Sequence, residues 1–331
     1  MKRRLLMTVA AFGFGFLASA GTQALAQDKP PLCTTDCLLT GGEKGDYYRF
    51  FAPPVMDLLD KGWAQVPKAE SPGTPASMDW VLTHQKSYFL AQGNVYADLV
   101  TNDPKYTGKF KLLSANKGLG NEVLLAIIND GTMRRSQGSW KAIAVHAKQV
   151  RIVTSSKESG PGRTLLWMMQ KDPEHLGKGS PVYMDSVDAA IEAVATGKAD
   201  VALMVQFPNP ENPRFKMIAE KKLNIIGIID ESFRSLEIPG GGPAFTICED
   251  AAVGPNVTVT TVCTPVLVAT GATNDNQDVA KDFAKVTAAD FMPKDTGFAK
   301  FWKAVKVRGG DAWEGTLKKA NTLADFAASK M

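Results

Sequence analysis

The sequence predicts an α/β fold built around a largely parallel sheet. Short apolar runs alternate with helical patterns along most of the chain, and such alternation is typical of strand–helix–strand units. The clearest example lies between residues 150 and 205, where a strand, a polar turn, two helices and a second strand follow one another. The chain has 331 residues, which is enough for two domains that each have their own core.

The first 26 residues have the pattern of a secretory signal peptide. Residues 2–4 are Lys-Arg-Arg, residues 5–17 are an apolar run too short to span a bilayer, and Ala24 and Ala26 occupy the positions that a signal peptidase reads. We therefore expect cleavage before Gln27, export to the periplasm and no stable membrane insertion. An uncleaved N-terminal anchor is the alternative interpretation.

Removal of this leader leaves about 305 residues, of which 35 are basic and 34 acidic. A mixed surface of nearly zero net charge favours neither nucleic-acid binding nor attachment to an anionic membrane. We therefore expect no nucleic-acid partner.

The chain contains four cysteines, and an even number in an exported protein favours disulfide bonds. Four cysteines permit three pairings, and sequence alone does not decide among them. Closeness along the chain favours Cys33–Cys37 and Cys248–Cys263. A zinc site is the weaker alternative, because the cysteine spacing does not match paired knuckles and the three histidines are scattered. We expect neither a metal site nor a cofactor.

The first third of the mature chain contains the pattern of two strands and two helices. We expect strands at 37–39 and 87–92, and helices at 46–60 and 78–85. The pair Pro53-Pro54 should kink the 46–60 helix or shorten its first part. A strongly apolar strand is expected next, at 124–128.

The middle third predicts a strand at 150–154, a helix at 164–170, a helix at 187–196 and a strand at 199–205. Asp185 is expected to cap the second of these helices and Gly197 to end it. After an apolar run at 224–229, one long strand is predicted at 257–269. The tail should be helical at 277–289, 297–305 and 313–328.

The first candidate site is the turn that joins the strand at 37–39 to the following helix. Its candidate residues are Gly41, Gly42, Gly45, Asp46, Tyr47 and Tyr48. A glycine-rich turn leaves backbone N–H groups accessible, and the helix N-terminus adds partial positive charge, so a carboxylate or phosphate would be favoured there. The pattern is neither a Walker A loop nor a dinucleotide fingerprint. An ordinary strand–helix turn without a ligand is the alternative.

The second candidate is a similar turn after the strand at 150–154. It supplies Ser159, Gly160, Gly162, Arg163 and Thr164. Arg163 could bind a carboxylate with two parallel hydrogen bonds, and is our predicted carboxylate partner. Alternatively, Arg163 is solvated or pairs with Glu158.

Two further loops are candidates: a turn before the helix at 78–85, and a loop that ends the strand at 199–205. One is rich in hydroxyl groups and offers Ser71, Gly73 and Thr74, and the other offers Phe207 and Asn209. Ligands of open α/β sheets bind beyond the carboxyl ends of the strands, which is where all four loops lie.

The sequence carries no recognisable catalytic motif. We therefore expect a binding protein rather than an enzyme. An exported enzyme that uses Glu43, Asp46 or Glu158 as an acid or base is a less favoured alternative, and a structural envelope protein is another.

These turns, in this order, resemble the TAXI family of solute-binding subunits of TRAP transporters. The family turn T-G-G-x-x-G-x-Y-Y is matched by Thr40 to Tyr48, and a family strand end looks like the segment from Gln92 to Tyr96. The family's G-S-G-T turn is similar to residues 159–164, and its helix and G-x-x-D-A strand to residues 189–200. Glu43, Lys44 and Asp46 put charges where the family usually has small residues.

The resemblance implies a type II periplasmic-binding-protein fold, in which two α/β lobes are joined by two crossover strands with a ligand cleft between them. Residues 27–121 and 256–331 would form the first lobe, and residues 122–255 the second. It also implies that Gln92 lines the cleft. The implied function is capture of a small anionic or zwitterionic solute, an organic acid or amino acid, and its delivery to integral-membrane transporter subunits. A receptor of the same fold for an ABC importer or a periplasmic sensor is the alternative.

Overall fold

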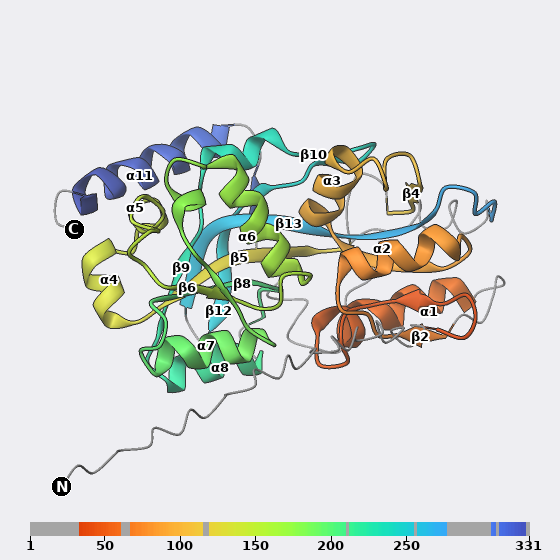
Figure 1. Cartoon of the computed structure of the whole chain (residues 1–331), viewed down its shortest axis with the longest axis horizontal. Helices are drawn as coiled ribbons and strands as arrows, with labels where there is room; N and C mark the ends of the chain where they lie inside the picture. The colour runs from red at the N-terminus through yellow and green to blue at the C-terminus, as the bar shows by residue number, and fades with distance from the viewer. Residues whose placement is uncertain are drawn as a thin grey trace, which may run out of the picture. The chain divides into compact units, whose positions relative to one another are not determined.

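A computed structural model describes residues 33–60, 67–114, 119–209, 212–254, 257–276, 306–308 and 311–328 (Figure 1). The predicted signal peptide and the helices predicted at 277–289 and 297–305 lie outside the described residues. We call residues 33–114 and the end of β13 the first half. Residues 119–254, the start of β13, β14 and α11 form the second half.

The first half contains a small sheet whose strands β1, β2 and β3 are parallel. Its elements are β1 (Leu38–Leu39), the π-helical segment η1 (Tyr47–Phe51), α1 (Ala52–Asp60), β2 (Lys68–Ala69), α2 (Thr74–Thr83), β3 (Tyr88–Gln92), α3 (Gly93–Asn102) and β4 (Phe110–Leu112). The strands β3 and β4 both pair with β13 in the antiparallel direction. The carboxyl ends of β1, β2 and β3 therefore lie at the same edge of the sheet.

The second half contains a larger mixed sheet, in which β8, β6 and β7 are parallel neighbours. Along the chain as far as β8, its elements are β5 (Asn121–Ile128), α4 (Asp130–Ser136), α5 (Trp140–Val145), β6 (Ile152–Thr154), α6 (Gly160–Lys171), η2 (Leu176–Lys178), β7 (Val182–Tyr183), α7 (Val187–Ala195) and β8 (Val201–Gln206). They are followed by α8 (Pro213–Glu220), β9 (Asn224–Gly227), η3 (Glu231–Ser235), β10 (Glu237–Ile238), β11 (Gly242–Pro243) and β12 (Thr246–Gly254).

The long strand β13 (Val257–Gly271) joins the two sheets, as Figure 1 shows. Its first part pairs with β12 and β5, and its last part with β3 and β4. The chain thus passes between the halves in β5 and again in β13, and these two crossing segments pair with each other at Glu122 and Thr264. The predicted long strand at 257–269 is confirmed.

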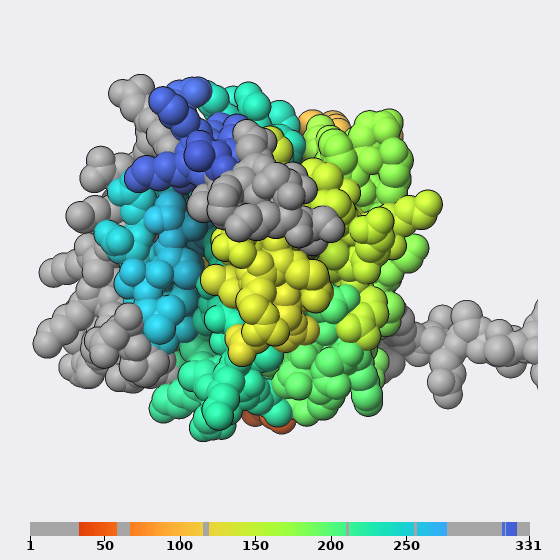
Figure 2. Space-filling view, turned by 90° about the vertical axis from the view of Figure 1, so that its left-hand side faces the viewer, coloured from red at the N-terminus to blue at the C-terminus, as the bar shows by residue number. Residues whose placement is uncertain are grey.

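The helix α11 (Asp311–Ala328) packs against α4 and α5 of the second half and against β14 (Lys306–Arg308), which pairs with β12. In Figure 2, the dark blue residues of α11 and the yellow residues of the segment around α4 lie on the same face. The helix predicted at 313–328 is therefore present. It lies on the second half, whereas residues 256–331 were expected to belong to the first lobe. The lobe boundaries are a proposal.

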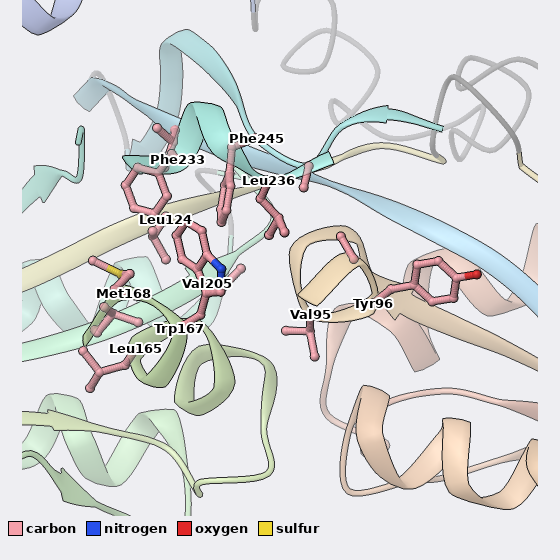
Figure 3. Close-up of a cluster of buried hydrophobic side chains, with 14 of the residues drawn as sticks. Val95, Tyr96, Leu124, Leu165, Trp167, Met168, Val205, Phe233, Leu236 and Phe245 are labelled. Carbon is pink, nitrogen blue, oxygen red and sulfur yellow. The ribbon is translucent and has the colours of Figure 1, made fainter. Parts of the chain in front are cut away.

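The core crosses from one half to the other. Figure 3 shows Val95 and Tyr96 of α3 on one side and Trp167 of α6 on the other. The Trp167 ring stacks on Phe233 with a centroid distance of 5.6 Å and lies 5.4 Å from the ring of Phe245. Aromatic groups bury large apolar areas, so this cluster fixes α6 against the second sheet.

Two local expectations need correction. Ser186, not Asp185, caps α7, because the Ser186 hydroxyl accepts a hydrogen bond from the N–H of Ala189. The predicted helix at 46–60 begins as the π-helical segment η1, and α1 places Pro53 and Pro54 in its first turn, where the missing N–H groups of proline are tolerated. Gly197 follows α7 with φ of +70°, as expected of a C-terminal stop.

The cysteines are bonded as Cys33–Cys37 and Cys248–Cys263, the pairing that closeness along the chain favoured. The second bond joins the neighbouring strands β12 and β13. Within the described ranges, no helix is both long enough and apolar enough to cross a membrane.

Candidate functional site

A pocket of about 540 Å³ lies where strands of both halves end. Residues that follow β1, β2 and β3 line it from the first half, and residues that follow β6, β7 and β8 line it from the second. Carboxyl ends of parallel strands are the usual position for ligands in α/β sheets. The pocket is therefore the candidate site.

The glycine turn of the first half forms one wall of the pocket. The N–H of Gly45 donates to the carbonyl of Gly42 at 2.7 Å, and the N–H of Glu43 donates to the Glu70 carboxylate at 3.1 Å. These bonds fix the turn against the end of β2. The N–H groups of Gly41 and Gly42 have no hydrogen-bond partner within the described chain, so a ligand could use them.

Three α-helices begin at the pocket. Gly73 and Thr74 start α2, Ser159 and Gly160 start α6, and Val187 starts α7. The first N–H groups of a helix have no partner inside the helix and carry partial positive charge. These helix ends would stabilise an anionic group of a ligand.

A group of hydrogen-bonded polar side chains lies at the inner side of the pocket. The Tyr47 hydroxyl donates to Glu122 Oε2 at 2.6 Å, which joins η1 of the first half to β5 of the second. Asp46 Oδ2 accepts from the Gln206 amide and from the N–H of Phe207, at 3.2 Å for the latter. These bonds connect the two halves directly through the side chains that line the pocket.

Burial changes the acidity of these groups. Desolvation raises the pKa of Asp46 to about 6, against the lowering effect of Arg214 and of its hydrogen bonds to Phe207 and Gln206. The pKa of Glu122 is raised to about 8, chiefly by desolvation and also by the nearby Asp46 charge. Burial likewise raises the pKa of the Tyr47 hydroxyl well above its usual value, so it remains a donor.

The guanidinium of Arg214 lies at the second-half wall of the pocket. It donates to Gln206 Oε1 at 2.7 Å and to Asp188 Oδ1 at 2.7 Å. Arg214 is the second residue of α8, which begins at Pro213 behind the cap Asn212. The position of this cation is thus set by a helix that follows the loop after β8.

Solved structures share this architecture. The ligand-binding core of GluR0 in complex with L-glutamate is 7% identical, covers 82% of this chain and 98% of its own, and has a TM-score of 0.50. A protein of Xanthomonas citri solved with bound ATP is 10% identical, covers 90% of this chain and 100% of its own, and also has a TM-score of 0.50. MatC from Rhodopseudomonas palustris with bound malate is 13% identical over 89% of this chain and 98% of its own, with a TM-score of 0.48. No protein-family model matches the sequence, and no curated protein matches it.

The chain has a type II periplasmic-binding-protein fold. The fold expected from the sequence is therefore confirmed.

Ten of the residues predicted for the site line this pocket of the type II fold. They are Gly41, Gly42, Gly45, Asp46, Tyr47, Gly73, Thr74, Gln92, Ser159 and Gly160. Their roles in binding remain predictions.

The other predicted residues lie around the pocket and do not line it. Ser71 and Thr164 are buried supports, since Ser71 Oγ donates to the carbonyl of Thr40, and Thr164 Oγ1 accepts from Gln92 at 2.8 Å. The remaining members of this set are Tyr48, whose ring faces the amine of Lys68, Gly162 within α6, the buried Phe207, Asn209 and Arg163.

Arg163 faces α3 of the first half. Its Nη2 lies 3.9 Å from Asp98 Oδ2, and its buried Nε has no hydrogen-bond partner among the described residues. The alternative partner, Glu158, is thus not the one found. Arg163 contacts the opposite half beside the pocket, and Arg214 is the arginine that lines it.

Sequence reasoning missed Glu122, Gln206 and Arg214. One signal for Glu122 was present, because it is a carboxylate at the start of the apolar run of β5. It reaches the pocket because β5 runs antiparallel to β8 with Val123 opposite Gln206. That pairing brings the start of one strand to the end of the other, which the sequence pattern does not reveal.

Proposed function

We propose that the protein is a periplasmic solute receptor that encloses a small solute between its two halves. The observation that carries this proposal is the pocket, which is lined from both halves by the turns that follow parallel strands. Its volume of about 540 Å³ is suitable for a small organic acid or an amino acid. The resemblance of the turns at 40–48 and 159–164 to a solute-binding family supports the same function.

In this proposal, the solute binds one half and the other half closes over it. Contacts that exist only in the closed state would stabilise that state. Several hydrogen bonds between the two halves are suited to this role. Gln92 and Asn94 of the first half donate to Thr164 of the second at 2.8 and 2.9 Å. A Cβ atom on Gly73 would lie 2.7 Å from the carbonyl oxygen of Glu158, so the halves approach closely at this point.

The lobes of the receptor are proposed to follow these contacts. Residues 27–121 would form most of the first lobe and residues 122–255 most of the second. The packing of α11 and β14 favours assigning 306–328 to the second lobe, with the boundary within β13 after Cys263.

The negatively charged part of a solute would be bound by the helix N-termini and by Arg214. Arg163 was expected in this role, and its position beside Asp98 favours Arg214 instead. Matched Arg163→Ala and Arg214→Ala variants show which of the two arginines binds the solute. If Arg214 binds the solute, its variant should weaken affinity at least tenfold, and the Arg163 variant should change it less.

Delivery to a TRAP-type transporter is the finer part of the proposal and rests on the resemblance to the TAXI family. A receptor for an ABC importer or a periplasmic sensor would use the same fold. Neighbouring genes distinguish these partners, since permease subunits, an ATPase or a sensor kinase would identify the system.

The direct test is mass spectrometry of small molecules released from the purified protein by denaturation. A single solute in a ratio near one to one supports the proposal. A thermal-shift screen against amino acids and organic acids provides the second arm, because a solute that binds only the folded state raises the melting temperature. Absence of any solute in both arms would contradict the proposal, and turnover of the released solute during long incubation would favour an enzyme.

A further inference from the structure

The charged side chains that line the pocket are mostly acidic. Five carboxylic acids face it, and they are opposed by only two basic residues, which are Lys44 and Arg214; the acids are Glu43, Asp46, Glu70, Glu122 and Asp185. One base is already engaged, because Arg214 Nε donates to Asp188 outside the lining. A simple dianion would have to enter a pocket with an excess of negative charge.

Two of these acids are almost completely buried. Asp46 is 8% exposed and Glu122 is 7% exposed, and they come from opposite halves of the molecule. Each uses only one carboxyl oxygen within the protein, Oδ2 of Asp46 and Oε2 of Glu122. Within the described chain, Asp46 Oδ1 and Glu122 Oε1 have no hydrogen-bond partner, and both side chains line the cavity.

Neither buried acid has a basic partner at ion-pair distance among the described residues. Desolvation of the two carboxyl groups is only partly offset, by the charges of Arg214 and Arg49 and two hydrogen bonds at Asp46 and by the Tyr47 hydrogen bond at Glu122, so burial raises their pKa values to about 6 and about 8. A cation placed against the two free oxygens would supply the missing compensation. An ammonium group has three donors and needs acceptors in this arrangement.

We propose that the solute carries a protonated amine, which binds between the free carboxyl oxygens of Asp46 and Glu122. This inference rests on the proposed receptor function and specifies the chemical class of its solute. The class comprises amines, basic amino acids and amino acids whose carboxylate reaches the helix N-termini on the outer side of the pocket. Carboxylates without an amine are excluded from it.

A metal ion is a less suitable occupant of this position. In the part of the chain that the structure describes, no three His, Cys, Asp or Glu side chains are grouped closely enough to hold one. Two carboxylates and one tyrosine hydroxyl suit the hydrogen-bond donors of an ammonium group better than the six or more oxygens of a hard cation.

The test uses three probes of equal length and different charge: 1,5-diaminopentane, 5-aminopentanoate and glutarate, together with L-lysine. Affinities are measured by calorimetry and melting temperatures by thermal shift, on protein refolded from denaturant to remove any bound solute. We expect at least one amine-bearing probe to bind, with an affinity at least tenfold higher than that of glutarate. Binding of glutarate at equal or higher affinity, or no binding of any amine-bearing probe, would overturn the inference.

Variants locate the amine. Glu122→Gln and Asp46→Asn keep the shape of the side chain and remove its charge, and each should weaken binding of the amine-bearing probe at least tenfold. Glu174→Gln is the matched control, because Glu174 lies shortly before η2, its side chain is 78% exposed, and it does not line the pocket. Equal affinity of wild type and both pocket variants would refute the assigned position.

The inference and the proposed function can fail separately. If mass spectrometry of the released solute identifies a carboxylate without an amine, the receptor function stands and the amine site does not. If the amine-bearing probes bind to the pocket but are converted chemically, the amine site stands and the receptor function does not.

Discussion

Replacing Glu122 by glutamine should make the protein more stable, and the gain should depend on pH. In the folded state the pKa of Glu122 is raised from its usual 4.5 to about 8, so the folded protein holds a proton there that the unfolded chain has already released. Stability therefore falls as the pH rises from about 4.5 to about 8, because the folded state binds more protons than the unfolded state over this range. Glutamine never ionises, so the variant should not show this loss.

The size of the effect follows from the pKa change. One pKa unit corresponds to about 1.4 kcal/mol, so the raised pKa of Glu122 should lower the free energy of unfolding by roughly 3 kcal/mol at pH 7, where the folded protein retains the proton, and by roughly 5 kcal/mol above pH 8, where it is ionised. The groups that face it are Asp46, which disfavours its charge, and the Tyr47 hydroxyl, which favours it. Arg214 and Arg49 act on Asp46 rather than on Glu122 directly.

The assay is denaturant unfolding of wild type, Glu122→Gln and the control Glu174→Gln at pH 4.5, 7 and 9, without added solute. The difference between Glu122→Gln and wild type should be close to zero at pH 4.5 and largest at pH 9. In a chain of this size, 1 kcal/mol corresponds to roughly 2 °C, so the melting temperature should rise by roughly 10 °C at pH 9. A difference that stays constant from pH 4.5 to pH 9 would show that Glu122 is not a buried acid whose pKa is raised.

Three other variants test the closed arrangement and its supports. Gly73→Ala places a Cβ atom 2.7 Å from a carbonyl oxygen of the opposite half at a φ of +155°, so solute affinity should fall at least tenfold; unchanged affinity in calorimetry would show that this contact does not form. Thr164→Val removes the acceptor of two buried amide groups and should cost about 1–3 kcal/mol in denaturant unfolding, whereas a neutral result would contradict those bonds. Replacing both Cys248 and Cys263 by serine should cost about 3 kcal/mol, because a loop of 15 residues is no longer closed in the unfolded chain, and an unchanged melting temperature would contradict this expectation.

The elements that the sequence predicted well are those with a local signal. The apolar run at 124–128 is part of β5, and the polar turn before Thr164 opens α6, because apolar periodicity and turn glycines act over a few residues. The helix α3 was missed although Val95, Tyr96, Leu99 and Val100 follow helical spacing, because it starts at Gly93 directly after a strand.

The pocket lining was predicted in part for the same reason. Its glycine turns are local features, whereas the acid pair is produced by long-range pairing. Asp46 and Glu122 are 76 residues apart and meet only because η1 packs on the ends of β5 and β8. Which charged side chains meet through such long-range contacts depends on strand register, and one sequence does not determine the register.

The strand that belongs to both sheets limits where the two proposed lobes could move apart. Pairing with β5 ends at Pro265 and pairing with β3 begins at Val266, so backbone rotation has little room elsewhere along β13. The disulfide at Cys263 ties the preceding stretch to β12 and prevents the pivot from moving further into the second sheet. In the proposed receptor, opening would therefore turn about residues 264–265, next to Glu122, so contacts at the mouth of the pocket would separate furthest and those beside Glu122 least.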